Sequence, residues 1–385
     1  MNRDELRKLV ADLVAIPSVN PLDEPIGEGR GEAELAAFVS SRLQEAGIAC
    51  ELREALPGRP NLVARVSGKS EEAIWFDAHL DTVSGEGMEF DPFTPHIDGD
   101  RLLGRGAADN KGSLAAMMAA LISVAADGEQ PPATIMLTGA ADEEYQMRGL
   151  RSLLESGLRA RGAVVGEPTG LEIVIAHKGV ARFRVATKGK AVHSSRPEQG
   201  VNAIYRMGRV LQALEAYAKR GVGRETHPLL GRGSLSVGII RGGKHVNVVP
   251  ARCEIEVDRR LLPGEEARKA VSDVRAYLNS AVEEDIGLEV IGPELVVPGL
   301  SMPADHPLVQ AVSAAVREVT GKAPVTGMMG ATHAAELAAA GIPAVVFGPG
   351  ALGQAHTAAE ELDLNQLEQA AAVYEKMMRS GLAAH

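Results

Sequence analysis

The sequence predicts an α/β protein in which a mixed sheet flanked by helices carries an inserted ferredoxin-like α+β domain. Up to about residue 180, apolar strand-like runs alternate with helical stretches, as they do in α/β layers. From there to about residue 291, the strands alternate charged and apolar residues, and the elements follow the order β-α-β-β-α-β. The first pattern resumes near Val297. We therefore expect one domain made of residues 1–178 and 297–385 and an inserted domain made of residues 179–296.

The elements of the first domain follow from hydrophobic periods and turn residues. An N-terminal helix is predicted by one apolar face made of Leu6, Leu9, Val10, Leu13 and Val14. Continuous apolar runs predict buried strands at residues 74–81, 133–139, 163–166 and 344–347. A hairpin turn at Asp98-Gly99 precedes a helix over 113–126, and the alanine-rich stretch 334–340 favours another helix. Two more helices are predicted from Pro307 and after the capping box Asp363-x-x-Gln366.

The inserted domain contains strands that alternate between wet and dry faces. Residues 180–185 read as a strand, residues 202–219 as a helix, and residues 234–240 and 252–258 as two further strands. A helix over 265–282 and a strand at 288–291 complete the unit. Such alternation is typical of antiparallel sheets with one solvated face.

Composition narrows the class of protein. With 45% hydrophobic and 24% charged residues among 385, the chain is long enough for two globular domains. A net charge of −11 disfavours nucleic acid as a partner, and any anionic substrate needs a local basic cluster. No signal peptide and no run of about 18 apolar residues is apparent, so no membrane association is expected. Cys50 and Cys253 are the only cysteines, which favours a reducing cytoplasm.

Side chains of the kinds that bind metals recur where the predicted strands end. They are His79, Asp109, Glu143, Glu144, Glu167 and His356. The carboxyl ends of strands in open α/β sheets are where ligands gather, so residues far apart in sequence can meet there. This mixture of histidines and carboxylates indicates a two-metal hydrolytic centre, and the chain therefore looks like a metalloenzyme.

The first two signals come from His79 and Asp109. Side chains alternate along a strand, so His79 and Asp81 project to the same side, and the carboxylate can accept one ring N–H while the other nitrogen binds a metal. Glycines on both sides of Asp109 allow close approach of the backbone just ahead of a helix. A histidine satisfied at a strand end and an aspartate capping a helix are the alternatives.

The next signals are acidic. The strand at 133–139 delivers the triplet Asp142-Glu143-Glu144, and neighbours in an extended segment point in opposite directions. Glu143 and Glu144 should therefore have different roles, one as a ligand and the other facing the water to be deprotonated. Pro168 holds Glu167 in an extended conformation. The alternative for the triplet is a solvated acidic surface.

Seven segments carry a family resemblance across almost the whole chain. They are FDAHLDTV, GRGAADNKG, GAADEE, VVGEPTG, GKAVHSSRPEQGVNAI, GGKHVNVVPARCEIEVDRRLLPGE and FGPGALGQAHTAAE. In this order they resemble the di-zinc peptidase and deacylase superfamily, which contains acetylornithine deacetylase, succinyl-diaminopimelate desuccinylase, aminoacylases and carboxypeptidase G. The resemblance implies a metallopeptidase catalytic domain with an inserted lid or dimerisation domain. Glu rather than Asp at position 167 is similar to the deacetylase and desuccinylase side of the superfamily.

The resemblance assigns roles to the residues at the strand ends. It implies that His79 and Glu167 bind one metal, that Glu144 and His356 bind the other, and that Asp109 bridges them. Asp81 would orient His79, Glu143 would be the general acid/base, and a cis peptide is expected between Asp109 and Asn110. The three carboxylate ligands and a bridging hydroxide would balance two divalent ions, whereas the acids alone would be costly to bury. Zinc fits this mixed ligation, and so do cobalt and manganese.

Within the insert, the resemblance singles out three residues. The histidine matching His193 reaches the metal centre in relatives, often from the partner subunit of a dimer, and stabilises the oxyanion. Positions matching Asn247 and Arg260 hold the substrate's carboxylate, which an arginine can grip with two parallel N–H bonds. We therefore expect a homodimer formed through the inserted domain.

The chain departs from the family pattern at one substrate-binding segment. Where relatives commonly carry Ser/Thr-Asp-x-Arg, this chain has Ala331-Thr332-His333-Ala334-Ala335, so His333 replaces the aspartate and the arginine is absent. The nearby acid Glu336 does not take the place of the missing aspartate. Thr332 and His333 remain candidates for substrate binding, with His333 either a determinant of specificity or a structural replacement.

The sequence thus predicts a cytoplasmic, metal-dependent amidohydrolase that cleaves the amide of an N-acyl amino acid. A water bridging two metals would attack the carbonyl, and Glu143 would carry its proton to the leaving amine. A dipeptidase or carboxypeptidase-type exopeptidase is the alternative within the same class. A metal-dependent binding protein without catalysis is the alternative from a different class, and a retained base at Glu143 argues against it.

Overall fold

The computed structural model describes residues 1–27, 31–223, 225–282 and 286–382. Contacts within the chain divide it into two compact units. The first comprises Met1–Ile175, Met302–Thr326 and Thr332–His385, and the second comprises Ala176–Ser301 and Gly327–Ala331. Among the described helices, none is long and apolar enough to cross a membrane.

The first unit contains most of a nine-stranded mixed sheet, which confirms the predicted fold class. Its path is β1 (Ala49–Leu56), β2 (Arg59–Val66), β6 (Ala133–Ala140), β3 (Ser70–His79), β7 (Gly162–Val165), β15 (Ala344–Val346), β8 (Ile173–His177) and β13 (Leu300–Ser301), with β14 (Val325–Met328) paired to β8. The four central strands β6, β3, β7 and β15 are parallel. Their carboxyl ends therefore lie along one edge of the sheet.

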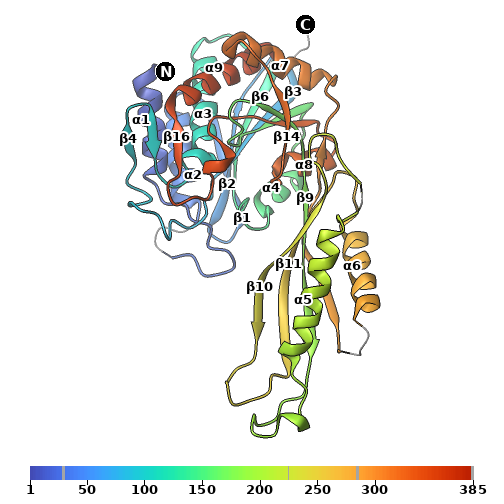
Figure 1. Cartoon of the computed structure of the whole chain (residues 1–385). Helices are drawn as coiled ribbons and strands as arrows, with labels where there is room; N and C mark the ends of the chain where they lie inside the picture. Colours follow the sequence, from blue (N-terminus) through green and yellow to red (C-terminus); the bar gives the residue numbers. More distant parts are fainter. Residues whose placement is uncertain (28–30, 224, 283–285, 383–385) are drawn as a thin grey trace. The chain divides into compact units, whose positions relative to one another are not determined.

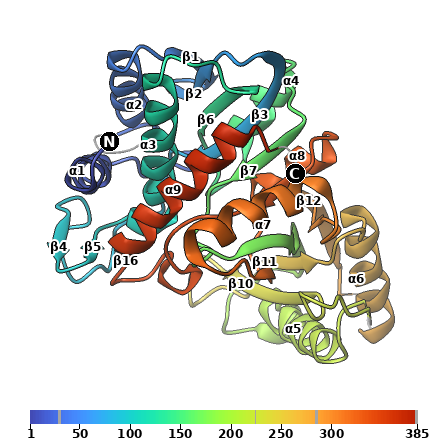
Figure 2. The ribbon, with the colours of Figure 1, turned by 90° about the horizontal axis from the view of Figure 1, so that it is seen from above.

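Helices cover both faces of this sheet. They are α1 (Arg3–Val14), α2 (Ala33–Glu45), α3 (Gly112–Ala126), α4 (Arg148–Glu155), α7 (Pro307–Thr320), α8 (His333–Ala339) and α9 (Leu364–Ser380). Figure 2 shows α9 crossing α3 on one face. On that face the Tyr374 ring makes T-shaped contacts with Phe76 and Phe347 in the main core. Because side chains alternate along β3, Trp75, Asp77 and His79 project to the opposite face, where α8 packs against β7 and β15.

Local sequence explains where these helices begin. The apolar face predicted for α1 is buried, and Asn2 with Glu5 forms a capping box at its start. Asp363 caps α9 by accepting the N–H groups of Asn365 and Gln366. The predicted capping box also requires the Gln366 side chain to accept the N–H of Asp363. Gln366 Oε1 accepts the N–H of Gly350 instead.

A small antiparallel sheet connects two distant segments of the first unit. Its strands are β16 (Glu361–Asp363), β5 (Arg101–Leu103) and β4 (His96–Asp98). The predicted turn at Asp98-Gly99 is confirmed, since Asp98 pairs with Arg101. Pairing of Glu361 with Leu103 brings the C-terminal segment beside the glycine-rich loop that follows β5.

The second unit has the predicted β-α-β-β-α-β order. The elements are β9 (Gly179–Lys188), α5 (Ala203–Lys219), β10 (Ser234–Gly242), β11 (Arg252–Leu261), α6 (Ala267–Ala281) and β12 (Glu289–Val297). The sheet is antiparallel with strand order β10-β11-β9-β12, and α5 and α6 close the core on one face (Figure 1). Phe183 and Val185 are buried in that core, while Arg182 and Arg184 form ion pairs on the solvated face. The predicted alternation is thereby confirmed.

Candidate metal centre

β3 delivers His79 to the carboxyl edge of the central sheet. The side chain is buried, and its Nε2 lies 3.0 Å from Asp109 Oδ1. Its Nδ1 lies 2.8 Å from the backbone carbonyl oxygen of Asp81. The sequence predicts the Asp81 carboxylate as the acceptor of this bond, but that carboxylate is 3.7 Å from Nδ1. Asp81 therefore fixes the ring through its main chain, which still leaves Nε2 free to act as a ligand.

The Asp81 carboxylate instead holds the turn that follows β6. Its two oxygens accept the N–H groups of Glu143 and Glu144, each at 3.0 Å, and Asn20 Nδ2 donates to it at 2.7 Å. The segment is a turn in which Asp142 has φ of +68°, and not the extended run that the sequence predicts. The opposite orientation of Glu143 and Glu144 therefore does not follow from strand geometry, and their contacts distinguish them.

A buried ionic network supports the turn that contains Asp142, Glu143 and Glu144. Arg59 donates to the Glu32 carboxylate through Nε at 2.8 Å and to Asp142 through Nη1 at 3.0 Å. Arg148 donates to the other side of Asp142, with Nε 2.6 Å from Oδ2. Burial opposes ionisation of Asp142, but hydrogen bonds and charges from Arg148 and Arg59 outweigh it and lower its pKa. The network fixes the backbone that presents Glu143.

Asp109 lies in a single wide turn, Ala107–Lys111, directly before α3. Gly106 precedes the turn with φ of +82°, a conformation that glycine adopts readily. The peptide bond between Asp109 and Asn110 is cis, as predicted. Asn110 Nδ2 donates to the Gly166 carbonyl at 2.7 Å and so connects this turn to the end of β7.

Glu360 holds the same turn from the C-terminal segment. Its Oε1 accepts the backbone N–H groups of Ala108 and Asp109, both at 3.0 Å. Its Oε2 accepts the N–H of Gly106 at 3.1 Å and Arg105 Nη1 at 2.6 Å. This buried carboxylate thus fixes the backbone of Asp109 with three main-chain bonds.

Glu167 follows β7 and His356 follows β15. Gly348 passes so close to Glu167 that a Cβ on the glycine would lie 2.5 Å from the Glu167 carbonyl oxygen. The side chain of His356 is 52% exposed, and its Nε2 lies 3.0 Å from Glu144 Oε2 and 3.3 Å from Asp109 Oδ2. His356 has φ of +62°, which is uncommon for residues other than glycine and often occurs at functional sites.

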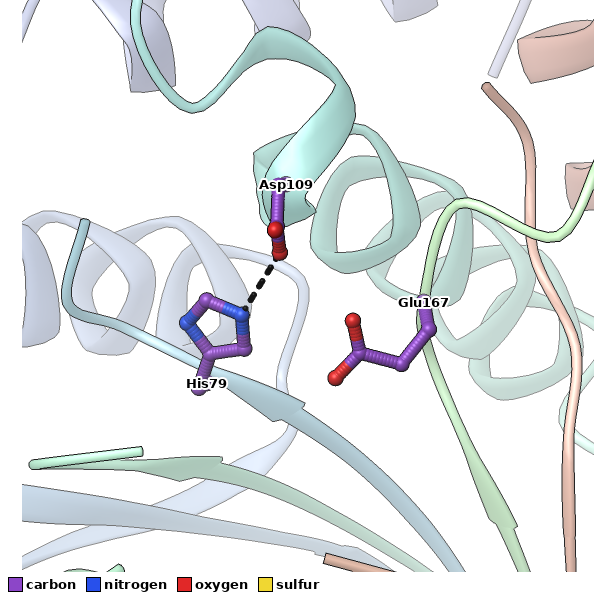
Figure 3. Close-up of side chains that lie close together, drawn as sticks. All are labelled: His79, Asp109 and Glu167. Atoms are coloured by element: carbon purple, nitrogen blue, oxygen red, sulfur yellow. Dashed lines mark hydrogen bonds and ion pairs between the residues drawn. The ribbon is translucent and has the colours of Figure 1, made fainter. Parts of the chain in front are cut away.

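Five of the predicted residues form two groups that share Asp109. In the first group, ligand atoms of His79, Asp109 and Glu167 lie within 4.8 Å of one another (Figure 3). In the second group, ligand atoms of Asp109, Glu144 and His356 satisfy the same limit. Among the described residues, Glu143 belongs to neither group.

The chemistry of these donors fits divalent cations. Burial and the charge of Asp109 raise the pKa values of Glu144 and Glu167, so the carboxylates resist ionising together. Hydrogen bonds to Asp109 and Glu144 raise the pKa of His356 to about 10. Two divalent cations at these positions would neutralise the same charges, with mixed nitrogen and oxygen ligation that suits zinc.

Comparisons with known proteins support this picture. Residues 75–380 match Peptidase family M20/M25/M40. Acetylornithine deacetylase from Myxococcus xanthus is 33% identical over 380 residues, covering 96% of this chain and 95% of that protein. This chain belongs to that family. The match establishes a hydrolase that acts on amide bonds, with candidate metal ligands at the positions described above.

Two further known proteins are similar to this chain over nearly its whole length. N-formyl-4-amino-5-aminomethyl-2-methylpyrimidine deformylase from Halalkalibacterium halodurans is 26% identical, covering 96% of this chain and 92% of the relative. The di-peptidase Dug1p from Saccharomyces cerevisiae has a TM-score of 0.81 at 16% identity, covering 98% of this chain and 96% of that one. At this identity, the structural similarity shows the M20 fold alone.

The segment that departs from the family pattern begins α8. Thr332 is the N-cap of α8, and its hydroxyl accepts the N–H of Ala334 at 3.2 Å. His333 is buried, with Nδ1 2.7 Å from Asp77 Oδ2. Arg151 pairs with Glu336, so that acid has a partner of its own. These contacts give Thr332 and His333 structural partners, and their role in substrate binding stays a prediction.

The other predicted residues lie in the second unit. His193 is exposed, with Nδ1 2.8 Å from Ser195 Oγ. The N–H of Ser194 donates to the Asn247 carbonyl at 3.0 Å, so the loops of His193 and Asn247 are neighbours. Arg260 is the penultimate residue of β11, and its Nε lies 2.8 Å from Asp258 Oδ1. An anionic substrate would have to compete with Asp258 for this guanidinium.

Sequence reasoning missed the residues that support the centre. Glu360 follows His356 by four residues, but the sequence does not indicate which groups its carboxylate binds. Glu32 and Arg59 carried no pattern that separates them from surface charges. Burial of a charge within an apolar run, as at Asp77 in IWFDAHL, is the one local signal that would have indicated a buried partner.

Proposed function

We propose that this protein hydrolyses the amide bond of an N-acyl amino acid at a centre that binds two divalent metals. His79 and Glu167 would hold one metal, Glu144 and His356 the other, and Asp109 both. The observation that carries the proposal is the pair of ligand groups sharing Asp109, with the half-buried residue Glu143 outside both groups. A binding protein would need the ligands but not the additional acid.

The residues around the centre have separable tasks. When bound, the metals would lower the pKa of water and polarise the scissile carbonyl. Glu143 accepts the proton of the attacking water and returns it to the nitrogen of the leaving amine. Burial raises the pKa of Glu143 to about 8, which suits a group that must both accept and release a proton near neutral pH. Asp81 holds the main chain at Glu143 and Glu144 while the proton moves.

An N-acyl amino acid is favoured over a peptide by the whole-chain similarity to an acetylornithine deacetylase. The dipeptidase or carboxypeptidase alternative rests on neighbours whose low identity supports only the fold. In either case, the substrate's carboxylate needs a cation because the chain carries a net charge of −11. Arg260 and Asn247 would provide that contact, and His193 would stabilise the oxyanion.

The second unit would serve as a lid and as the surface of a homodimer. β10 is an edge strand of its sheet, and exposed apolar side chains lie on or near it, including Ile240 at 53% and Tyr205 at 76% exposure. Unpaired edges with apolar side chains favour association with another strand. Cys50 and Cys253 are both free, which is compatible with a cytoplasmic location.

A substrate screen tests the proposal. Protein loaded with zinc, cobalt or manganese is assayed with N-acetyl, N-succinyl and N-formyl amino acids and with dipeptides, and the released amine is measured. We expect turnover of at least one N-acyl amino acid, and loss of turnover after chelation. Turnover of dipeptides alone would replace the proposal by the exopeptidase alternative. Absence of any amide cleavage by the fully metal-loaded protein would refute it.

A further inference from the structure

The side chain of Arg105 joins three segments around the candidate metal centre. Its Nη1 donates to Glu360 Oε2 at 2.6 Å, its Nη2 to the Thr357 carbonyl at 3.1 Å, and its Nε to the Ser84 carbonyl at 3.0 Å. Ser84 lies five residues after His79. Arg105 is 2% exposed, so these bonds are shielded from water. The guanidinium is therefore held on three sides by groups that are distant in the sequence.

Two of these acceptors lie beside residues of the second ligand group, which comprises Asp109, Glu144 and His356. Thr357 directly follows His356. Glu360 accepts the backbone N–H of Asp109 at 3.0 Å. One side chain thus connects the loop of His356 to the carboxylate that fixes Asp109, and the positions of these two ligands relative to each other depend on it.

The loop of His356 needs such a connection. The N–H groups of Gln354, Ala355 and Thr357 each donate to the carbonyl three residues earlier, which shapes the loop but does not attach it to another segment. The His356 side chain is 52% exposed and its φ is +62°, so the residue gains little from packing and has an uncommon backbone conformation. The bond from Arg105 to the Thr357 carbonyl attaches the main chain one residue from the ligand.

A salt bridge to Glu360 alone would not require an arginine. The ammonium of a lysine can pair with a carboxylate, but it is a point charge without a rigid fork of donors. A guanidinium presents its donors in fixed directions, and all three nitrogens of Arg105 donate. Two of the three donate to main-chain carbonyls and not to Glu360. The arginine therefore does more than neutralise the buried acid.

We propose that Arg105 is a positioning residue that holds the His356 loop at a fixed distance from the Asp109 turn and thereby raises the affinity of the second ligand group for its cation. The inference rests on the proposed function, because it concerns one of the two metals of that centre. Glu360 holds the turn, and Arg105 transmits that position to the loop. The first ligand group depends less on this connection, because its two other ligands stand at the ends of central strands.

The test compares Arg105→Lys with the unaltered full-length protein, both free of metal at the start. Lysine keeps a positive charge beside Glu360 but cannot also reach the Thr357 carbonyl. Zinc binding is measured by calorimetric titration, and the step at the second group is the one that His356→Ala abolishes. We expect Arg105→Lys to weaken that step by about 10- to 100-fold, the usual scale for a residue that supports a metal ligand, and to leave the other step nearly unchanged.

Arg101→Lys is the matched control. It makes the same exchange four residues earlier, where Arg101 pairs with Glu361 at 3.2 Å and its side chain is 66% exposed. Neither step should change in this variant, because exposed ion pairs contribute little. An equal fall of both steps in Arg105→Lys would overturn the proposal, since it would make Arg105 a support of the whole centre. Unchanged affinity at the second group would overturn it as well.

A double variant keeps the proposal testable if Arg105→Lys does not fold. Arg105→Gln combined with Glu360→Gln replaces the buried ion pair by two amides, so neither charge is left buried without its partner. Compared with Glu360→Gln alone, the double variant should weaken the step at the second group by a further factor of about ten or more and leave the other step as it is in the single variant. Equal affinities in the two variants would overturn the proposal.

A measurement without metal or substrate separates this inference from the proposed function. Hydrogen exchange of the metal-free protein, followed by mass spectrometry, reports the opening of residues 352–358. We expect exchange there to be about 2- to 12-fold faster in Arg105→Lys, the range for loss of one hydrogen bond, and unchanged in Arg101→Lys. Unchanged exchange in Arg105→Lys would overturn the inference even if the amide-hydrolysing activity is found. Faster exchange with weaker zinc binding at the second group, in a protein without that activity, would retain the inference and refute only the proposed function.

Discussion

The two ligand groups share Asp109 but differ in how the fold holds them. His79, Asp109 and Glu167 are all buried, and His79 and Glu167 stand at the ends of central strands. In the other group the Glu144 side chain is 7% exposed, but His356 has a 52% exposed side chain on a loop. Buried side chains on rigid elements are preorganised, whereas loop side chains are positioned less tightly. The difference indicates one fixed metal position and one adjustable position beside the same bridging carboxylate.

The largest expected effect concerns a residue outside both groups. Glu143→Gln removes the base but no ligand, so kcat should fall by roughly 10²–10⁴ while both metals are retained. Glu144→Gln should instead weaken the metal of the exposed group. Metal content by elemental analysis and kcat on the substrate found by the screen check both variants. Loss of metal from Glu143→Gln, with metal retained in Glu144→Gln, would mean that the two roles are exchanged.

The contrast between these neighbours also shows what the sequence could predict. Hydrophobic periods placed every central strand, and parallel strands bring their carboxyl ends to one edge, so His79, Asp109, Glu144, Glu167 and His356 could be expected to meet. The cis peptide at Asp109-Asn110 followed from the family resemblance. The second unit was predictable because its strands alternate with a period of two residues.

Hydrogen-bond partners could not be predicted in the same way. Period and turn residues fix the direction of a side chain, but its partner depends on segments far away in sequence. The Asp81 carboxylate binds the turn after β6 and not His79, because that turn offers two free N–H groups. The Gln366 side chain accepts the N–H of Gly350, and the Glu360 carboxylate accepts N–H groups of a turn about 250 residues earlier. Such long-range contacts leave no local pattern in the sequence.

A smaller effect is expected for a residue of the second unit that belongs to neither ligand group. If His193 stabilises the oxyanion, His193→Ala should lower kcat by roughly 10²–10³ and leave both metals bound. His227→Ala is the control within the same unit, since the His227 ring accepts the N–H of Leu229 in its own loop. An unchanged kcat for His193→Ala on the true substrate would remove His193 from the mechanism.

A variant that disturbs the support of the shared ligand Asp109 also tests the comparison between the two ligand groups. Glu360 fixes the main chain of Asp109, so Glu360→Gln should weaken both metals together, by roughly 10- to 100-fold in affinity. The amide can still accept bonds through its oxygen, but its NH₂ group faces a backbone donor. Glu361→Gln is the matched control one residue away. Weakening of only one metal would show that Glu360 serves one group and not the bridge.

The smallest expected effect is the difference in affinity between the two groups themselves. Binding at the exposed group must order the His356 side chain, which costs about 0.5–1.5 kcal/mol. We therefore expect zinc to bind in two steps, the second weaker by roughly 2- to 12-fold, and repulsion between the two cations adds to this difference. Calorimetric titration of metal-free protein measures both steps.

Variants of the two groups then assign the steps. His356→Ala should abolish the weaker step and leave the stronger one near its original affinity, because the buried ligands His79 and Glu167 are untouched. Glu167→Gln should have the converse effect and reduce the stronger step, since it alters a ligand that the fold has already positioned. If His356→Ala abolishes the stronger step, the exposed group binds first. Burial would then fail as a guide to affinity at this centre.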